Sequence, residues 1–229
     1  MENLLIQYLE KGFHEPEKPD LSRPKPFVTI SREFGCPSKP VAEMLVEALN
    51  KYALGEKDPK WKMINKEVVE QAARELDLEP NRIKYLFNAE RRGTWDDILA
   101  SFSDNYKSNL KIKKTIKEVI TSFALEGHVV LVGRGSVAIT QSMPRSLHIR
   151  LQGPLEWRAS EYAQRHDINY EEALKVAIET DKKRTGLIEI FLGKKFDPGI
   201  FDLIINCQRI SKEDIVRTIV YQMQLRKMI

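Results

Sequence analysis

Short apolar runs alternate along this chain with longer segments whose apolar residues recur at helical spacing. The run 128–132 contains only Val and Leu after its first residue, which is typical of a strand buried on both faces of a parallel sheet. In the run 147–151, three aliphatic residues alternate with His148 and Arg150, which predicts a less buried strand. Together the apolar runs predict strands at 27–31, 61–64, 128–132, 147–151 and 202–206.

Helical periodicity fills the intervals between these runs. Ser211 is a suitable N-cap for the last helix, and Asp214 supplies a carboxylate partner three residues later. Alternation of strands with helices predicts an α/β sandwich around a parallel sheet, in which ligands bind beyond the carboxyl ends of the strands. The predicted helices are 40–52, 66–76, 80–91, 108–126, 154–166, 170–185 and 211–226.

The chain divides into an arm and a main domain. Residues 1–26 combine a short amphipathic helix at 3–12 with a proline-rich linker, and this helix is expected to pack on the main body or on a partner subunit of a homo-oligomer. Residues 27–229 form the main domain. Within it, residues 65–127 contain several helical patterns and no clear strand, which predicts a helical insertion.

Composition and charge argue against a membrane-spanning protein and a nucleic-acid-binding protein, and they leave most other classes open. The 229 residues are 42% hydrophobic and 31% charged, as in an ordinary globular protein. No apolar run approaches the roughly 20 residues of a membrane span, and the N-terminus lacks a signal-peptide core, so we expect a cytoplasmic protein with Cys36 and Cys207 reduced. The net charge of +4 suits anionic metabolites, whereas the basic runs lack the interleaved aromatic residues of a nucleic-acid surface.

The segment 27–49 is the strongest candidate for chemistry. An apolar strand breaks into a loop that carries Gly35, Ser38 and Lys39, and a helix follows. Loop N–H groups and a helix N-terminus can then point at one phosphate, with Lys39 or Arg32 as the cation. The standard spacing G-x-x-x-x-G-K-[ST] is not met, because no second glycine occurs and Pro40 stands where a hydroxyl is expected. Taken alone, the loop slightly favours an ordinary turn.

Two further constellations lie at or near the predicted carboxyl edge of the sheet. Gly133 and Gly135 flank Arg134, so the backbone can turn sharply and the guanidinium can grip a phosphate; a helix-capping turn is the alternative. Arg158, Arg165 and the run 181–184 fall on two predicted helices. Each is a solvated helix charge when taken separately, but together they resemble a basic lid.

These residues resemble the cytidylate kinase-like family of phosphate-loop (P-loop) nucleoside monophosphate kinases. The family's first strand and loop, close to I-T-I-S-R-E-F-G-S-G-G-R-E-I-A, read VTISREFGCPSKPVA here. Four further family segments have similar counterparts in this chain. The family's Y-D-K-E-I-I-E-E-A-A is similar to INKEVVEQAA at 64–73, and its V-I-V-G-R-G is similar to VVLVGRG at 129–135. Its D-K-x-R corresponds to DKKR at 181–184, and its Y-D-L-V-I-N-T-S corresponds to FDLIINCQ at 201–208. The resemblance is collinear over about residues 27–222.

The resemblance implies a three-layer sandwich with a five-stranded parallel sheet, a monophosphate-binding insertion and a lid over about residues 154–195. It implies transfer of the γ-phosphoryl group of ATP, with Mg²⁺, to a nucleoside monophosphate such as CMP or dCMP. The implied roles are as follows: Arg32, Gly35, Cys36, Ser38 and Lys39 line the donor phosphates, Arg134, Asp181 and Arg184 bind the acceptor, and Lys39, Arg158 and Arg184 support catalysis.

The first loop departs from the family pattern. Cys36, Pro37 and Ser38 replace Ser-Gly-Gly, and Pro37 and Pro40 each remove a backbone donor. Each lost charge contact costs about 2–3 kcal/mol of transition-state stabilisation, so several together abolish transfer while leaving binding. The competing hypothesis is therefore a catalytically weak or inactive nucleotide-binding sensor or assembly module of the same fold.

Overall fold

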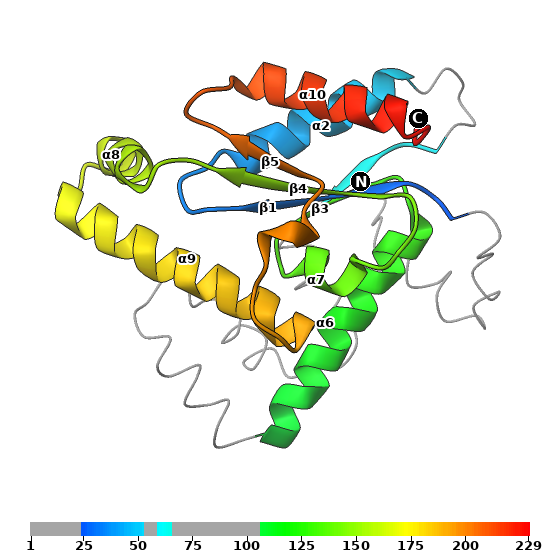
Figure 1. Ribbon diagram of the computed structural model, residues 1–229, viewed down its shortest axis with the longest axis horizontal. Coiled ribbons are helices and arrows are strands. Elements are labelled where there is room, and N and C mark those ends of the chain that lie inside the picture. Colours follow the sequence, from blue (N-terminus) through cyan, green and yellow to red (C-terminus); the bar gives the residue numbers. More distant parts are fainter. Residues whose placement is uncertain (1–23, 53–58, 66–105) are drawn as a thin grey trace, which may run out of the picture.

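The computed structural model describes residues 24–52, 59–65 and 106–229 and forms one parallel sheet with helices on both faces (Figure 1). The strand order is β2-β3-β1-β4-β5, and all the pairings are parallel. In register, Ile30 lies beside Val132 on one side and Ile149 on the other. The strands are β1 (Phe27–Arg32), β2 (Lys62–Ile64), β3 (Val129–Val132), β4 (Ser146–Gln152) and β5 (Leu203–Asn206).

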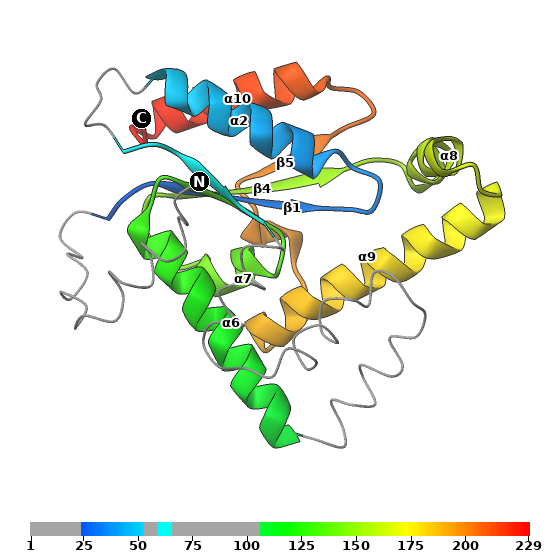
Figure 2. The ribbon, with the colours of Figure 1, turned by 180° about the vertical axis from the view of Figure 1, so that it is seen from behind.

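Two helices cover one face of the sheet, α2 (Ser38–Tyr52) and α10 (Lys212–Leu225). Val41, Leu45 and Leu49 form the buried stripe of α2, and burial of each such side chain contributes about 1.5–3 kcal/mol. This stripe packs against α10 and against those residues of β1 and β4 that face the two helices, and together they form the larger core. Figure 2 shows the same two-helix layer from behind.

The other face carries α6 (Tyr106–Glu126), the short α7 (Ser136–Thr140) and α9 (Tyr170–Leu192). α6 packs Ile120 and Phe123 against Phe27 and Leu131. α8 (Leu155–His166) lies beyond the carboxyl end of β4, and a 3-10 turn, η2 (Pro198–Ile200), precedes β5. Two loops therefore meet at the carboxyl edge: the first loop, residues 33–37 after β1, and the second loop, residues 133–135 after β3.

The predicted α/β sandwich and the strands are confirmed, and each strand's ends agree within one residue. The predicted cap is also confirmed, since the Ser211 hydroxyl accepts the Asp214 N–H at 3.1 Å and donates to the Asp214 carboxylate at 2.8 Å. The helices predicted at 3–12, 66–76 and 80–91 lie outside the described residues, so the arm and most of the insertion stay predictions.

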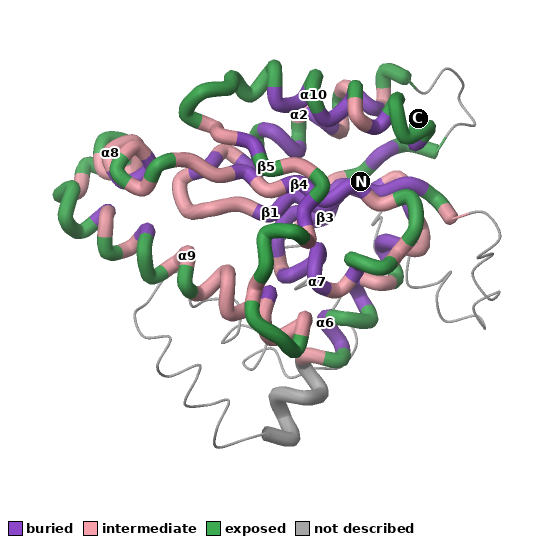
Figure 3. Tube along the Cα trace, viewed as in Figure 1, coloured by how far each residue is buried: buried purple, intermediate pink, exposed green. Residues whose placement is uncertain are grey.

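Three details of the structure were not expected from the sequence. β4 is less buried than β3, as predicted (Figure 3), but His148 within it is buried, with its Nδ1 2.8 Å from the Thr29 hydroxyl oxygen. α9 ends at Leu192 and not at the predicted residue 185. Gly193 caps the helix there with φ +69° and donates its N–H to the Glu189 carbonyl. The helix α7 has no counterpart in the predictions, because five residues are too few to show a helical period.

Candidate functional site at the carboxyl edge

The first loop is a tight turn whose backbone is held by the protein itself. Gly35 adopts φ +82°, and an added Cβ would lie 3.2 Å from the Cβ and the carbonyl oxygen of Arg158. The Cys36 N–H donates to the Glu33 carbonyl at 3.3 Å, and the Ser38 N–H donates to the Cys36 carbonyl at 2.9 Å. These bonds bend the chain back on itself before α2 begins.

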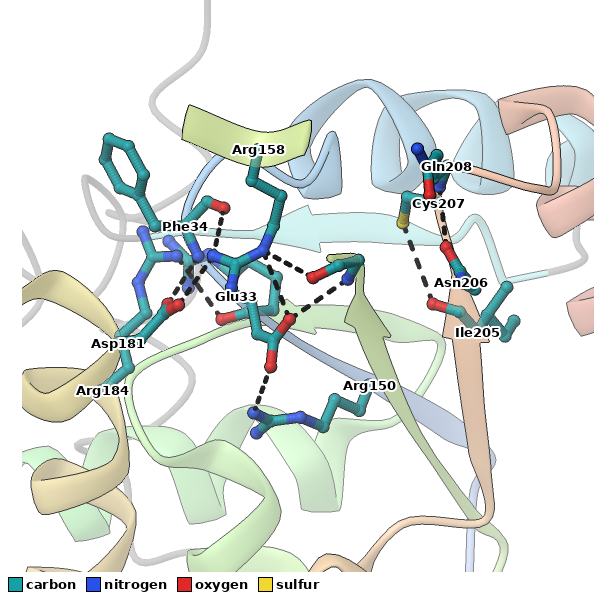
Figure 4. A network of polar contacts seen from close by, with 12 residues as sticks. Glu33, Phe34, Arg150, Arg158, Asp181, Arg184, Ile205, Asn206, Cys207 and Gln208 are labelled. Atoms are coloured by element: carbon teal, nitrogen blue, oxygen red, sulfur yellow. Dashed lines mark hydrogen bonds and ion pairs between the residues drawn. The ribbon is translucent and has the colours of Figure 1, made fainter. Parts of the chain in front are cut away.

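Asp181 on α9 also holds the first loop, through the backbone of Phe34. The Phe34 N–H donates to Asp181 Oδ1 at 2.6 Å, and Arg158 Nη1 donates to Asp181 Oδ2 at 2.7 Å and to the Phe34 carbonyl at 2.9 Å (Figure 4). Both polar groups of the Phe34 peptide are therefore bonded to side chains. The Asp181 carboxylate therefore takes up one N–H group of the first loop.

Arg158 is buried, with 4% of its surface exposed, and it joins α8 to the first loop. Its Nε donates to the Gly153 carbonyl at 2.8 Å and lies 3.4 Å from Glu33 Oε2. A buried charge requires this kind of complete pairing, since desolvation without partners costs several kcal/mol. Arg158 is thus a structural clamp in this conformation.

Glu33 belongs to the same network, although the sequence reasoning gave it no role. Its carboxylate accepts from Arg150 Nη2 at 3.2 Å and from the Gly153 N–H at 3.1 Å, in addition to its pairing with Arg158. Arg150 was missed as well. Its place at the carboxyl end of β4, a predicted strand, was the signal that could have revealed it.

A small cavity of about 30 Å³, open to solvent, lies between the second loop and α9. We call it the arginine pocket. The Arg32 guanidinium lies against Gly133, in the space that a Cβ at this position would fill. Arg184 Nη1 donates to the Arg32 carbonyl at 3.4 Å. The pocket is lined by Ser31, Arg32, Gly133, Arg134, Gly135, Arg150, Asp181, Arg184, Thr185, Leu187 and Ile188.

The structure brings together most of the candidate residues. Arg32, Arg134, Asp181 and Arg184 line the arginine pocket. Lys39 does not join them: its side chain is 71% exposed and lies 3.9 Å from Glu43, one turn along α2. Of the first-loop residues, Gly35 packs on Arg158, while Cys36 and Ser38 are buried.

The Cys36 side chain points into the core next to Cys207. Contact with the Cys207 thiol and burial both raise the pKa of Cys36. The pKa of Cys207 is lowered, chiefly because the Cys36 thiol hydrogen-bonds to it.

Across 24–52, 59–65 and 106–229, no group of three or more His, Cys, Asp or Glu side chains is arranged to hold a metal ion. None of the helices in this part of the chain combines the length and apolar character needed to cross a bilayer.

Comparison with protein families matches residues 27–209 to the cytidylate kinase-like family. A comparison with curated proteins gave no match. Among solved structures, an uncharacterized protein from Eubacterium ventriosum ATCC 27560 is 18% identical with a TM-score of 0.62, covering 87% of this chain and 98% of that chain. This similarity establishes the fold alone.

Two kinases are more distant. Shikimate kinase from Acinetobacter baumannii in complex with shikimate is 12% identical with a TM-score of 0.48, covering 89% of this chain and 95% of that one. A gluconokinase from Sinorhizobium meliloti 1021 is 15% identical with a TM-score of 0.43, and the match covers 85% of this chain and 89% of that chain. Both are too distant to inform the function of this chain.

Proposed function

The chain belongs to the cytidylate kinase-like family, and on that premise we propose that it transfers the γ-phosphoryl group of ATP to a nucleoside monophosphate. CMP and dCMP are the first acceptors to test. The observation that carries the proposal is the arginine pocket, a cavity at the carboxyl edge of the sheet with four guanidinium groups in its lining.

The pocket suits the phosphate of an acceptor. Arginine presents several N–H donors in a planar fork that matches phosphate oxygens, and a partly enclosed site strengthens the attraction. Arg134 is the middle residue of the second loop and has φ +58°, between two glycines that also have positive φ. We propose that Arg134 and Arg184 hold the acceptor phosphate, while Asp181 contacts the acceptor or fixes Arg158.

The donor side does not fit ATP phosphates in this conformation. The N–H groups of Phe34, Cys36 and Ser38 are bonded within the protein, and Pro37 and Pro40 have none. We propose that Asp181 leaves the Phe34 N–H when ATP binds, which returns one donor to the first loop. Mg²⁺, when bound, would neutralise phosphate charge, held mainly by substrate oxygens and water.

The bonded first loop also favours a second candidate function, a nucleotide-binding module without kinase activity. Its arginine pocket would bind a phosphate-bearing ligand while the first loop stays closed by Asp181. The two candidates share the pocket and differ in turnover, so a single set of assays distinguishes them.

The test measures ADP production from ATP and Mg²⁺ with a panel of nucleoside monophosphates. Turnover with CMP or dCMP that falls at least about tenfold in Arg134→Ala supports the kinase, because one lost charged contact is worth about 1.5–3 kcal/mol. Arg217→Ala, on the exposed surface of α10, is the matched control and should retain full activity.

Absence of turnover with every acceptor refutes the kinase proposal. Thermal stabilisation by a monophosphate that disappears in Arg134→Ala would then support the binding module. If neither turnover nor stabilisation occurs, both candidates fail. Lys39→Ala separately tests the donor role of Lys39, whose exposed position predicts a smaller effect than loss of Arg134.

A further inference from the structure

Arg150 lies near the carboxyl end of β4 and lines the arginine pocket. Its Nη2 donates to Glu33 Oε1 at 3.2 Å (Figure 4). Its guanidinium carbon lies 5.1 Å from the centre of the Phe196 ring and 5.7 Å from the centre of the Phe201 ring, which is the range of a cation–π contact. One carboxylate and two aromatic rings therefore hold a single guanidinium group.

These contacts fix the position of the Arg150 side chain before any ligand arrives. The side chain is only 14% exposed, and Phe201 belongs to a packed cluster with Val137 and Ile188. A mobile arginine side chain loses rotamer freedom when it binds an anion, and this loss weakens the binding. Because Arg150 is already ordered, the loss is small at this position.

The pairing with Glu33 leaves most of the donors of Arg150 unused. Within the described part of the chain, Nε and Nη1 of Arg150 have no hydrogen-bond partner. Solvent reaches these nitrogen atoms, because the fully buried side-chain atoms without a partner in this part of the chain belong to Ser136 and His148. An arginine that pairs only with a carboxylate frequently presents two parallel N–H groups to it. Arg150 instead keeps open donors on a side chain that lines a pocket.

The cations of the arginine pocket come from three elements. Arg150 belongs to β4, Arg134 to the second loop and Arg184 to α9, and all three line the same cavity. A carboxylate offers two oxygens in one plane, whereas a phosphate monoester offers three oxygens in a tetrahedral arrangement. Donors that approach from separate elements therefore suit a phosphate monoester better than a carboxylate.

We propose that Arg150 is a further phosphate-binding residue of the arginine pocket, and that the pocket selects a phosphate monoester over a carboxylate. Arg150 is the fixed cation of the site, and Glu33 and Phe196 position its guanidinium. This inference rests on the proposed function, since that function assigns the acceptor phosphate to the pocket. It adds a binding residue and a selectivity to that assignment.

Calorimetric titration of the full-length protein with inorganic phosphate, in the absence of ATP, tests the inference. Arg150→Met should raise the dissociation constant of phosphate at least about tenfold, because hydrogen bonds from a charged group are lost. Arg217→Met, on the exposed surface of α10, is the matched control and should leave the constant unchanged. Acetate should bind the wild-type protein at least about tenfold more weakly than phosphate.

Arg150→Lys separates phosphate binding from folding. Lysine keeps a positive charge beside Glu33 and lacks the planar fork of donors. The variant should therefore remain folded, as circular dichroism measures, and should bind phosphate at least about threefold more weakly than the wild type. It decides the question by itself if Arg150→Met does not fold.

The inference is overturned if phosphate binds either variant of Arg150 as tightly as the wild type, if the wild type binds no phosphate, or if acetate binds as tightly as phosphate. Turnover is a separate measurement, ADP production with CMP. An active kinase whose KM for CMP is unchanged in Arg150→Met would retain the proposed function and refute this inference. Loss of phosphate affinity in Arg150→Met, in a protein that phosphorylates no acceptor, would support the inference and refute the kinase proposal.

Discussion

Replacing Arg158 by methionine tests whether its buried guanidinium holds the first loop against α8 and α9. Methionine keeps much of the volume of the side chain and removes every donor. The change leaves the carbonyls of Phe34 and Gly153 without their partner, and it leaves the Asp181 and Glu33 carboxylates without one of their cations.

The expected loss of stability follows from these contacts. A hydrogen bond to a charged group is worth about 1.5–3 kcal/mol, and Arg158 makes three bonds of 2.7–2.9 Å. Water recovers part of this loss, since the Asp181 side chain is 22% exposed and Glu33 keeps Arg150. Removal of one partner from a buried pair typically costs about 3–5 kcal/mol. We therefore expect a loss of about 3–5 kcal/mol and a fall in melting temperature on the order of 10 °C.

Urea unfolding followed by tryptophan fluorescence and circular dichroism measures this change. Arg217→Met is the control, because that side chain is 80% exposed and its pair with Asp214 is worth less than about 1 kcal/mol. A loss below about 1 kcal/mol for Arg158→Met, with an unchanged m-value, would show that the guanidinium is not a structural clamp and that its pairing with Asp181 contributes little.

The other predictions concern the second loop, the last helix and a buried histidine. Gly133→Ala should destabilise the fold by about 1–2 kcal/mol, because φ is +74°, and should weaken phosphate binding by displacing Arg32; urea unfolding and phosphate titration measure the two effects. Ser211→Ala should cost about 1 kcal/mol by the same unfolding assay, whereas Ser211→Asp should retain stability. Burial lowers the pKa of His148 below about 6.5, so its contribution to stability is present above that value and is lost as pH falls through the folded-state pKa. His148→Gln should flatten this dependence in urea midpoints measured from pH 8 to 5; an unchanged slope would contradict the assignment.

Periodicity and strand composition were sufficient to predict the sheet. The Val-rich run before Gly133 and the apolar run from Phe27 both became buried strands, and the glycines after them mark turns at the carboxyl edge. Arg32 and Arg134 of the pocket could be anticipated from these strands, because Arg32 ends β1 and Arg134 follows β3. The family assignment rests on the same motifs, which occur in the same order along the chain.

Contacts between distant segments could not be predicted from local pattern. Arg158 has the sequence context of a solvated helix charge, yet it is buried by the first loop, which lies more than a hundred residues earlier. His148 appeared to be a polar interruption of a strand, yet β5 covers the far side of that strand. Asp181 has the sequence context of a helix charge one turn from Arg184, yet its carboxylate binds Arg158 on another helix at 2.7 Å.

The continuity of α9 has a mechanical consequence. The helix runs unbroken from Tyr170 to Leu192, and its C-terminal half is anchored where Ile188 packs against Val137. Asp181 and Arg184 are about 4.5 Å apart along its axis. A tilt of this continuous helix about its anchored end would move Asp181 and Arg184 together. Such a tilt would expose the Phe34 N–H and change the width of the arginine pocket in one movement, which would couple an anion bound by Arg184 to the first loop.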